Sequence, residues 1–310
     1  MASFFTIKRN YVIIKVTQKK WGFLMDKYEY CENIIQESSK SFYKAFSHLE
    51  KEKAQAVYAI YAFCRTADDA IDIDNDIKKI NQLKTDVKST FEGVVPKDLM
   101  FEALYESIMR YPSNVAPYLD LLDGMRDDYY NKPIKTEKEF DEYCYKAAST
   151  VGLMLLPVIA SKKYKSDSQK LKKVAIELGK AMQITNILRD VREDLMNDRI
   201  YFPDTLLEQF GVNIEIIRTG LVTAEWRALM EHYIDIAKEK YQIFYDNVDL
   251  FDDDAIFPTY LAAKFYEGIL DVIRRKDYKN INRRYYVSDF KKYFMMKKVK
   301  KELKQRGLGE

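Results

Sequence analysis

The segment CRTADDAID holds the first group of residues that could do chemistry. It places Arg65, Asp68, Asp69 and Asp72 within eight positions, directly after the apolar run AVYAIYAF. Residues three or four apart share a helix face, so Arg65, Asp68 and Asp72 point the same way and Asp69 lies off their stripe. Tyr61 lies on the same stripe behind them. A solvated face would be polar along its whole length, so the pattern favours a binding site at the end of an apolar helix.

The segment QITNILRDVREDLMNDR repeats this design far away in the sequence. Asn186, Asp190 and Asp194 are spaced i, i+4, i+8 and form one row, with Gln183 one turn before them and Arg189 at their side. The residues that precede them, LGKAMQ, are mostly small or apolar. One such helix alone would fit a solvated surface equally well, but two of them indicate a site.

Two facing helices of this kind would make a box of carboxylates, which is costly unless cations neutralise it. Mg²⁺ binds one or two carboxylates and completes its shell with water and substrate phosphate. Arginine binds phosphate oxygens through paired hydrogen bonds. We therefore expect a phosphorylated substrate with a long apolar body, held through Mg²⁺. The predicted metal ligands are Asp68, Asp72, Asn186, Asp190 and Asp194.

Helices must position these residues, because the apolar periodicity is helical almost throughout. No Gly/Ser linker or low-complexity segment divides the chain, which favours one all-α domain. The expected helices cover residues 26–46, 51–74, 76–90, 97–110, 114–131, 136–160, 167–198, 223–247, 250–277 and 284–305.

Composition excludes several other classes of protein. The 310 residues are 47% hydrophobic and 32% charged, which is a globular composition. A net charge of +3, with no basic stripe interleaved with aromatics, argues against a nucleic-acid partner. Three widely spaced cysteines and two histidines give neither a disulfide framework nor a zinc pattern. The chain is therefore expected to be cytoplasmic.

The two ends differ from this average. Residues 1–24 contain five Lys or Arg and no acid, and are expected to be an extension, or a mis-assigned start, before a folded domain over residues 25–310. Their YVIIKV is too short to span a bilayer. The C-terminal KKYFMMKKVKKELKQR suits either a solvated terminal helix or a helix lying on an anionic membrane, which would make the protein peripheral at the inner face.

Four stretches resemble the head-to-head isoprenoid synthases, the family of squalene, dehydrosqualene and phytoene synthases. They are SKSFYKAF, YAIYAFCRTADDAID, YCYKAASTVG and NILRDVREDLMNDRIYFP, and the resemblance covers roughly residues 26–290. It implies a single-domain helical bundle with a central cavity and both aspartate motifs near its mouth. It also implies Mg²⁺-dependent joining of two allylic diphosphates through a cyclopropyl diphosphate intermediate.

The same resemblance implies roles for individual residues. Asp68, Asp72, Asp190 and Asp194 would stabilise the departing diphosphates, and the Tyr143 hydroxyl would assist ionisation or proton removal, although a tyrosine there could simply belong to the core. The implied substrate contacts are Ser38, Ser39, Lys40, Ser41, Tyr61, Arg65, Gln183, Arg189 and Tyr266. The chain departs from the family pattern at Arg192, where glycine is frequent, and at Ser149, within the usual Ala-Gly-Thr.

The length of the isoprenoid substrate depends on which residues close the cavity. Tyr58 lies ten positions before Asp68 on the same stripe, roughly 15 Å along a helix. Phe46 lies behind the serine segment. With both as a floor we expect farnesyl diphosphate as substrate and dehydrosqualene as product, with phytoene from geranylgeranyl diphosphate as the alternative. No glycine-rich dinucleotide motif is present, which disfavours squalene formation with NADPH without excluding it.

Three rival functions stay open. A chain-elongating prenyltransferase or a terpene cyclase would use similar magnesium chemistry, but chain elongation typically needs two Asp-Asp-x-x-Asp motifs. The second acidic motif here has Asp190, Glu193 and Asp194 instead. A non-catalytic scaffold relative would be expected to lose aspartates, and all are present.

Overall fold

The structure, a computed structural model, describes residues 25–163 and 168–308. These residues form helices joined by short loops, and no strand occurs among them. The all-α prediction is confirmed. The helices are α1 (Lys27–Ser38), α2 (Lys40–Phe46), α3 (Lys51–Asp72), α4 (Ile77–Phe91), α5 (Leu99–Arg110), α6 (Ala116–Tyr129), α7 (Glu137–Cys144), η1 (Tyr145–Ser149), α8 (Thr150–Ile159), α9 (Gln169–Met196), α10 (Asp204–Phe210), α11 (Ile214–Arg218), α12 (Ala224–Asp246), η2 (Val248–Leu250), α13 (Asp253–Arg275), η3 (Lys279–Ile281) and α14 (Asp289–Gln305).

Local sequence explains where many of these helices begin. The Thr136 side chain accepts a hydrogen bond from the Glu139 N–H while Glu139 binds back to the Thr136 N–H, a capping box that starts α7. Asp98 caps α5 in the simpler way, through its carboxylate. Gly211, at φ 67°, ends α10 in the left-handed region that glycine adopts without strain.

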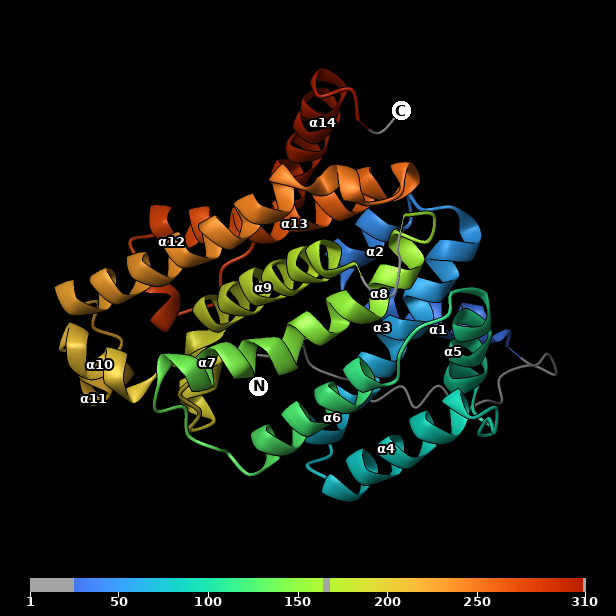
Figure 1. Cartoon of the computed structure of the whole chain (residues 1–310). Helices are drawn as coiled ribbons and strands as arrows, with labels where there is room; N and C mark the ends of the chain where they lie inside the picture. Colours follow the sequence, from blue (N-terminus) through green and yellow to red (C-terminus); the bar gives the residue numbers. More distant parts are fainter. Residues whose placement is uncertain (1–24, 164–167, 309–310) are drawn as a thin grey trace.

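Helix α9 lies at the centre of the bundle (Figure 1). Helices α12 and α13 pack on one side of it, and η1 and α8 pack on the other. Helix α3 contacts α8 and also packs against α1 and α5. The two helices that carry the acidic motifs are therefore both largely enclosed by other helices.

Three details differ from the expected elements. The helix expected over residues 26–46 breaks at Ser39, whose side chain caps α2. The expected helix 136–160 contains a π-helical turn, η1. Helices α10 and α11 were not predicted, because each is less than three turns long and too short to show a periodic pattern.

Gly179 lets α9 approach η1 closely. A Cβ atom at this position would lie 2.4 Å from the Ser149 Cα, which no packed structure tolerates. Ser149, one of the departures from the family pattern, is fully buried there and its hydroxyl donates to the Ile176 carbonyl at 2.7 Å. The departure at Ser149 is thus accommodated by a hydrogen bond to the facing helix.

The helix expected over residues 284–305 is observed as α14, Asp289–Gln305. The extension over residues 1–24 lies outside the described residues, so it stays a prediction. Within the described ranges, none of the helices combines the length and the apolar character needed to cross a membrane.

Candidate active site

The two acidic motifs meet at one polar pocket of about 360 Å³. Asp72, at the end of α3, lines it together with Asp190 and Asp194 of α9. Arg199 and Arg284 also line it, and neither was among the predicted site residues. The prediction that the two motifs face each other therefore agrees with this structure.

Arginine holds the acids of α3. The Arg65 guanidinium lies 3.4 Å from the Asp68 carboxylate and also pairs with Asp69 one turn on. Asp69 thus faces the arginine beside the stripe, as its spacing predicts. The Asp72 carboxylate accepts a hydrogen bond from Arg199 at 2.9 Å. Two arginines therefore pair with the three acids of the α3 cluster, which leaves one carboxylate charge in excess.

Asp190 is the most heavily paired acid of α9. Arg189 reaches it through two hydrogen bonds, of 2.7 and 2.6 Å, and Arg284 donates to it at 3.0 Å. Asp190 is 2% exposed, so these are buried, charge-assisted contacts. Asp194, one turn further, is also buried, and its Oδ2 has no hydrogen-bond partner.

Electrostatics in the pocket penalise further negative charge. Burial raises the pKa of Asp194 well above its ordinary value, and repulsion from Asp190 and Asp72 raises it further. Burial and Asp190 likewise raise the pKa of Glu193. Burial and the neighbouring Arg189 lower the pKa of Arg284. The shifts of Asp194 and Glu193 reflect carboxylates that lie close together in a buried pocket, which is a condition a cation would relieve.

The donor set fits a hard cation such as Mg²⁺. The buried Asn186 Oδ1 and Asp194 Oδ2 have no hydrogen-bond partner, and both are oxygen ligands of the type that Mg²⁺ prefers. No three acidic, cysteine or histidine side chains of the described residues form a ready-made metal cluster. Arginines hold Asp72 and Asp190 instead, so binding a cation would require these contacts to rearrange.

A line of buried polar side chains runs from the α9 motif to Tyr143. The Asn186 side-chain amide donates to Gln183 Oε1 at 3.2 Å, and Gln183 Nε2 donates to the Tyr143 hydroxyl at 3.4 Å. The Tyr143 ring stacks on Tyr201, whose hydroxyl donates to the buried Asp128 carboxylate at 3.2 Å. Burial raises the pKa of Tyr143 well above its ordinary value, so its hydroxyl keeps its proton near neutral pH.

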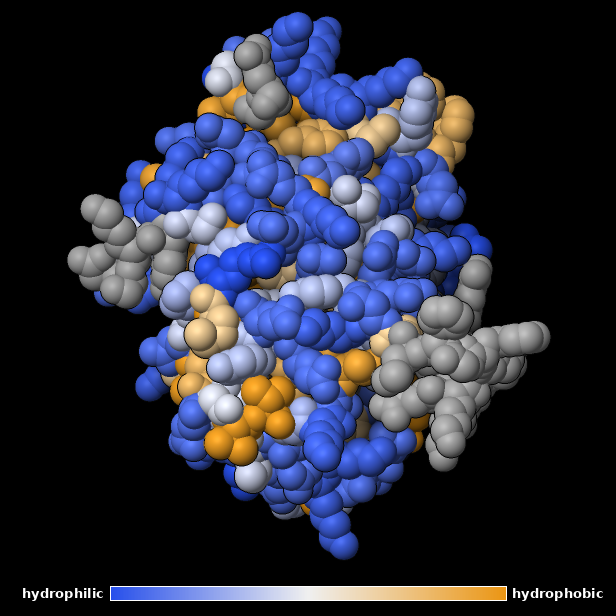
Figure 2. Space-filling view, turned by 90° about the vertical axis from the view of Figure 1, so that its right-hand side faces the viewer, coloured by the Kyte–Doolittle hydropathy of each residue, from blue (hydrophilic) through white to orange (hydrophobic). Residues whose placement is uncertain are grey.

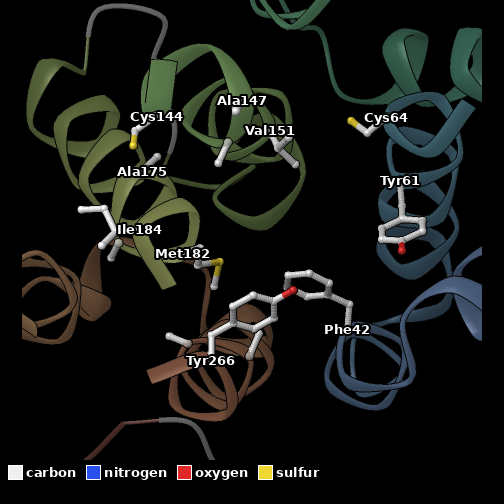
Figure 3. Packing of buried hydrophobic residues seen from close by; sticks show 14 of the residues in the cluster. Phe42, Tyr61, Cys64, Cys144, Ala147, Val151, Ala175, Met182, Ile184 and Tyr266 are labelled. Carbon is white, nitrogen blue, oxygen red and sulfur yellow. The ribbon is translucent and has the colours of Figure 1, made fainter. Parts of the chain in front are cut away.

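Behind the polar pocket lies a separate apolar cavity of about 70 Å³ between α2, α3, α8, α9 and α13. Phe42, Phe46 and Tyr61 line it, and Met182 of α9 closes one side. In Figure 3 the Phe42 ring faces Tyr266 of α13, with Met182 beside them and Tyr61 on α3. The ring centroids of Phe42 and Tyr266 are 5.0 Å apart.

Only one of the two predicted floor residues lies at this cavity. Phe46 lines it, whereas Tyr58 does not and instead packs its buried ring against Tyr43. The placement of Tyr58 at the floor was therefore wrong. Phe251, which precedes α13, lines the cavity and was missed, because it lies far from both motifs in sequence.

The serine segment surrounds the start of α2. Ser39 is buried and caps the helix through the Phe42 N–H, Lys40 is exposed, and Ser41 is half-buried. Ser38 is the last residue of α1. None of the four lines the polar pocket. Their contact with a diphosphate therefore stays a prediction.

Tyr266 connects the apolar and polar parts of the site. Its ring lies 6.0 Å from the Arg189 guanidinium carbon, within reach of a cation–π interaction. Arg192, the other departure from the family pattern, points its guanidinium to the Asn282 carbonyl instead of the acids. Arg284 and Arg199, by contrast, reach the acids, but the sequence offers no signal that separates Arg284 from its neighbour Arg283.

Comparison with known proteins gives the family. The chain matches the squalene/phytoene synthase family over residues 35–291. It is 33% identical over 289 residues to 4,4'-diapophytoene synthase of Staphylococcus haemolyticus, covering 91% of this chain and 99% of that protein. It is 34% identical over 279 residues to chloroplastic phytoene synthase of Daucus carota, covering 88% of this chain and 70% of that protein.

A solved structure supports the same assignment. The crystal structure of a dehydrosqualene synthase in complex with ligand superimposes with a TM-score of 0.84 at 39% identity, covering 90% of this chain and 97% of that one. The chain therefore belongs to the squalene/phytoene synthase family and is a head-to-head prenyltransferase.

Proposed function

We propose that this enzyme condenses two molecules of farnesyl diphosphate into dehydrosqualene. The observation that carries the proposal is the apolar cavity lined by α3, α9 and Phe46. Val57 is the α3 residue that lines it furthest from the pocket, 11 positions before Asp68, which is roughly 16 Å along the helix. That depth is comparable to a short isoprenoid tail, and bulky Phe46 and Phe251 also line the cavity.

The proposed reaction has two ionisations. Loss of the first diphosphate gives an allylic cation, the 2,3-double bond of the second substrate attacks it, and loss of a proton leaves a cyclopropyl diphosphate. Loss of the second diphosphate, rearrangement and loss of a second proton then give the C30 hydrocarbon without a reductant. Water must be excluded from both cations, which suits the buried aromatic surfaces of Phe42, Tyr61 and Tyr266.

Side chains of this chain would divide the work as follows. Asp68, Asp72, Asn186, Asp190 and Asp194 would hold Mg²⁺, the cation typical of this family, which supplies charge neutralisation for the leaving diphosphate. Arg65 and Arg189 would bind diphosphate oxygens. Because its pKa is raised, the Tyr143 hydroxyl would act as a hydrogen-bond donor during ionisation.

Two further proposals concern location and the alternative product. All three cysteines are free, as expected for a reducing compartment, so we place the enzyme in the cytoplasm. Phytoene formation is the second candidate, because the carrot phytoene synthase matches at a similar identity.

Product analysis tests the proposal. Purified protein would be incubated with Mg²⁺ and either farnesyl or geranylgeranyl diphosphate, with and without NADPH. We expect a C30 product with the dehydrosqualene central triene from farnesyl diphosphate, unchanged by NADPH. A C40 product would keep the mechanism and reject the chain length, squalene would reject the reductant-free ending, and no product from either substrate would favour a scaffold.

A further inference from the structure

The C-terminal helix α14 carries an unusual exposed patch. Phe290, Tyr293 and Phe294 are 75, 44 and 51% exposed, and Tyr286 just before the helix is 51% exposed. Of the eleven large apolar side chains exposed among the described residues, these four fall within nine consecutive positions. Singly exposed apolar residues are ordinary, but a cluster marks an interaction surface. We call these four residues the aromatic patch.

The patch is a packed unit on an amphipathic helix. The Phe290 and Phe294 ring centroids are 4.8 Å apart, and those of Tyr293 and Phe294 are 5.6 Å apart. The opposite face of α14 carries Val299 and Leu303, which are 2 and 1% exposed in the contact with α13. The helix is thus anchored to the bundle by one face and presents the aromatic rings on another.

Lysines continue the outer surface beyond the rings. The exposed basic residues are Lys297, Lys298, Lys300, Lys301 and Lys304. The Lys297 ammonium lies 4.6 Å from the Tyr293 ring centroid. Among acidic residues of α14, Glu302 is engaged by the Tyr260 hydroxyl and Asp289 lies 3.8 Å from Lys292. The outer face is therefore aromatic at its start and strongly positive towards its end.

Position links this surface to the active site. Arg284, which pairs with Asp190 in the polar pocket, has its guanidinium carbon 5.3 Å from the ring centroid of Tyr286. The aromatic patch therefore begins at the rim of the pocket. Helix α14 stands out from the bundle beyond α13 in Figure 1, and Figure 2 shows orange apolar groups beside blue hydrophilic ones at the same end of the molecule.

We propose that α14 docks this protein on an anionic lipid bilayer, with the aromatic patch at the level of the headgroups and the lysines on lipid phosphates. Aromatic rings with adjacent lysines are typical of interfacial helices, and the negative potential of a membrane attracts clustered lysines. Resting on the proposed function, this orientation sets the pocket rim at the surface from which a substrate with an anionic head and an apolar tail arrives.

Charge separates a bilayer from the other occupants. Lysine is depleted in protein–protein interfaces, whereas five exposed lysines follow the rings here. A second copy of the chain docked face to face would set lysine against lysine, which is repulsive. An anionic lipid surface matches both the rings and the lysines.

Sedimentation with vesicles tests the proposal on the full chain without substrate. Vesicles of phosphatidylcholine mixed with phosphatidylglycerol would be compared with pure phosphatidylcholine. We expect binding to the mixed vesicles that weakens with salt, and at least tenfold weaker binding for the double variant Phe290→Ser, Phe294→Ser. The matched control is Val94→Ser, Met109→Ser, which removes two apolar side chains of similar exposure, 68 and 64%, and should bind as the unaltered chain does.

A charge variant separates the two parts of the surface. Lys297→Gln, Lys301→Gln should lower binding to mixed vesicles, about fivefold per lysine, and leave the weak binding to pure phosphatidylcholine unchanged. Each variant should keep its turnover of detergent-dispersed substrate. This assay needs no product, so the bilayer proposal and the proposed function can fail separately.

Three results would overturn the proposal. The first is that the unaltered chain does not bind mixed vesicles. The second is that the Val94 and Met109 control loses as much binding as the aromatic variant. The third is that the Phe290 and Phe294 variant binds as well as the unaltered chain. Light scattering adds a decisive arm. If the aromatic patch variant turns a dimer into a monomer and vesicle binding is absent, the patch is a protein interface.

Discussion

Replacing Lys53 with methionine should strongly destabilise the fold. The Lys53 ammonium donates to Asp252 at 2.8 Å and to Asp254 at 2.7 Å, and links α3 to the start of α13. Its side chain is 4% exposed, and that of Asp252 is fully buried. Methionine keeps an unbranched side chain, shorter by one atom, and removes the charge and the hydrogen-bond donors.

The size of the stability loss depends on the contacts that Asp252 keeps after Lys53 is replaced. Breaking a buried ion pair by removing one partner costs about 3–5 kcal/mol, because the remaining charge is buried without compensation. Asp252 keeps hydrogen bonds from the Ser161 hydroxyl at 2.8 Å and the Lys162 N–H at 3.1 Å. We therefore expect the lower end, about 3 kcal/mol, or a fall in Tm of roughly 6 °C.

Acid should remove much of this difference. Burial acts to raise the pKa of Asp252, but hydrogen bonds from Lys53 and its other donors outweigh it and lower the pKa below the ordinary value. A lowered folded-state pKa stabilises the fold above the unfolded pKa of about 4, and this contribution is lost as pH falls through the folded pKa. The difference in free energy of unfolding between the unaltered chain and the Lys53→Met variant should therefore become smaller below about pH 4.

Urea unfolding at pH 7 provides the assay, with Lys84→Met as its control. Lys84 lies 2.7 Å from Asp123, but these side chains are 27 and 40% exposed, so its loss should cost less than about 1 kcal/mol. If Lys53→Met costs no more than Lys84→Met, the reasoning from burial is refuted. Lys53→Met should also loosen the packing around the apolar cavity. Two residues that line this cavity are tied to Asp252: Phe251 precedes it, and the Ile159 carbonyl accepts a hydrogen bond from its N–H.

Three further predictions concern the site. Asp72→Asn should abolish turnover with a Tm change of only a few degrees, since Asp72 is half-buried and asparagine can still accept a hydrogen bond from Arg199. Normal turnover in a product assay would exclude Asp72 as a ligand. Asp128→Asn should raise stability at pH 8. Burial raises the pKa of Asp128, so this group lowers the free energy of unfolding as pH rises above about 4. Urea titrations at several pH values should show that the free energy of unfolding falls less steeply with pH in the variant. Gly179→Val should cost several kcal/mol of stability, because it forces α9 away from Ser149. Gly93→Val should cost less despite the positive φ there, because a Cβ at that position meets open space. Thermal unfolding measures both variants, and equal losses of stability would contradict the close approach of α9 to Ser149.

Helical spacing predicted much of the site because the acids of each motif lie on one helix. Asp190 and Asp194 follow the four-residue rule, and burial of α9 follows from the apolar run before them. Asp72 and Asp190 line the same pocket. This could be predicted by assuming that two acidic helix faces, which repel each other, come together to share a cation.

The remaining features depend on tertiary packing that no local pattern contains. Arg284 reaches Asp190 from 94 positions away, and its neighbour Arg283 has the same residue type. Tyr58 was expected at the cavity because it shares a stripe with Asp68, but a stripe is about 100° wide and Tyr43 covers that part of it. Phe251 lines the cavity because the Lys53 contact fixes the start of α13.

The three cysteines have a practical consequence. Cys31, Cys64 and Cys144 are all free and buried, and burial raises the pKa of the Cys31 thiol to about 12. Since the thiolate is the reactive form, none of them should be alkylated by maleimides in the folded protein. A cysteine introduced at an exposed position such as Lys298 would then be the single labelling site in an otherwise unaltered chain. Fluorescent or spin probes could be attached to α14 directly, and its depth in a bilayer read out without first building a cysteine-free background.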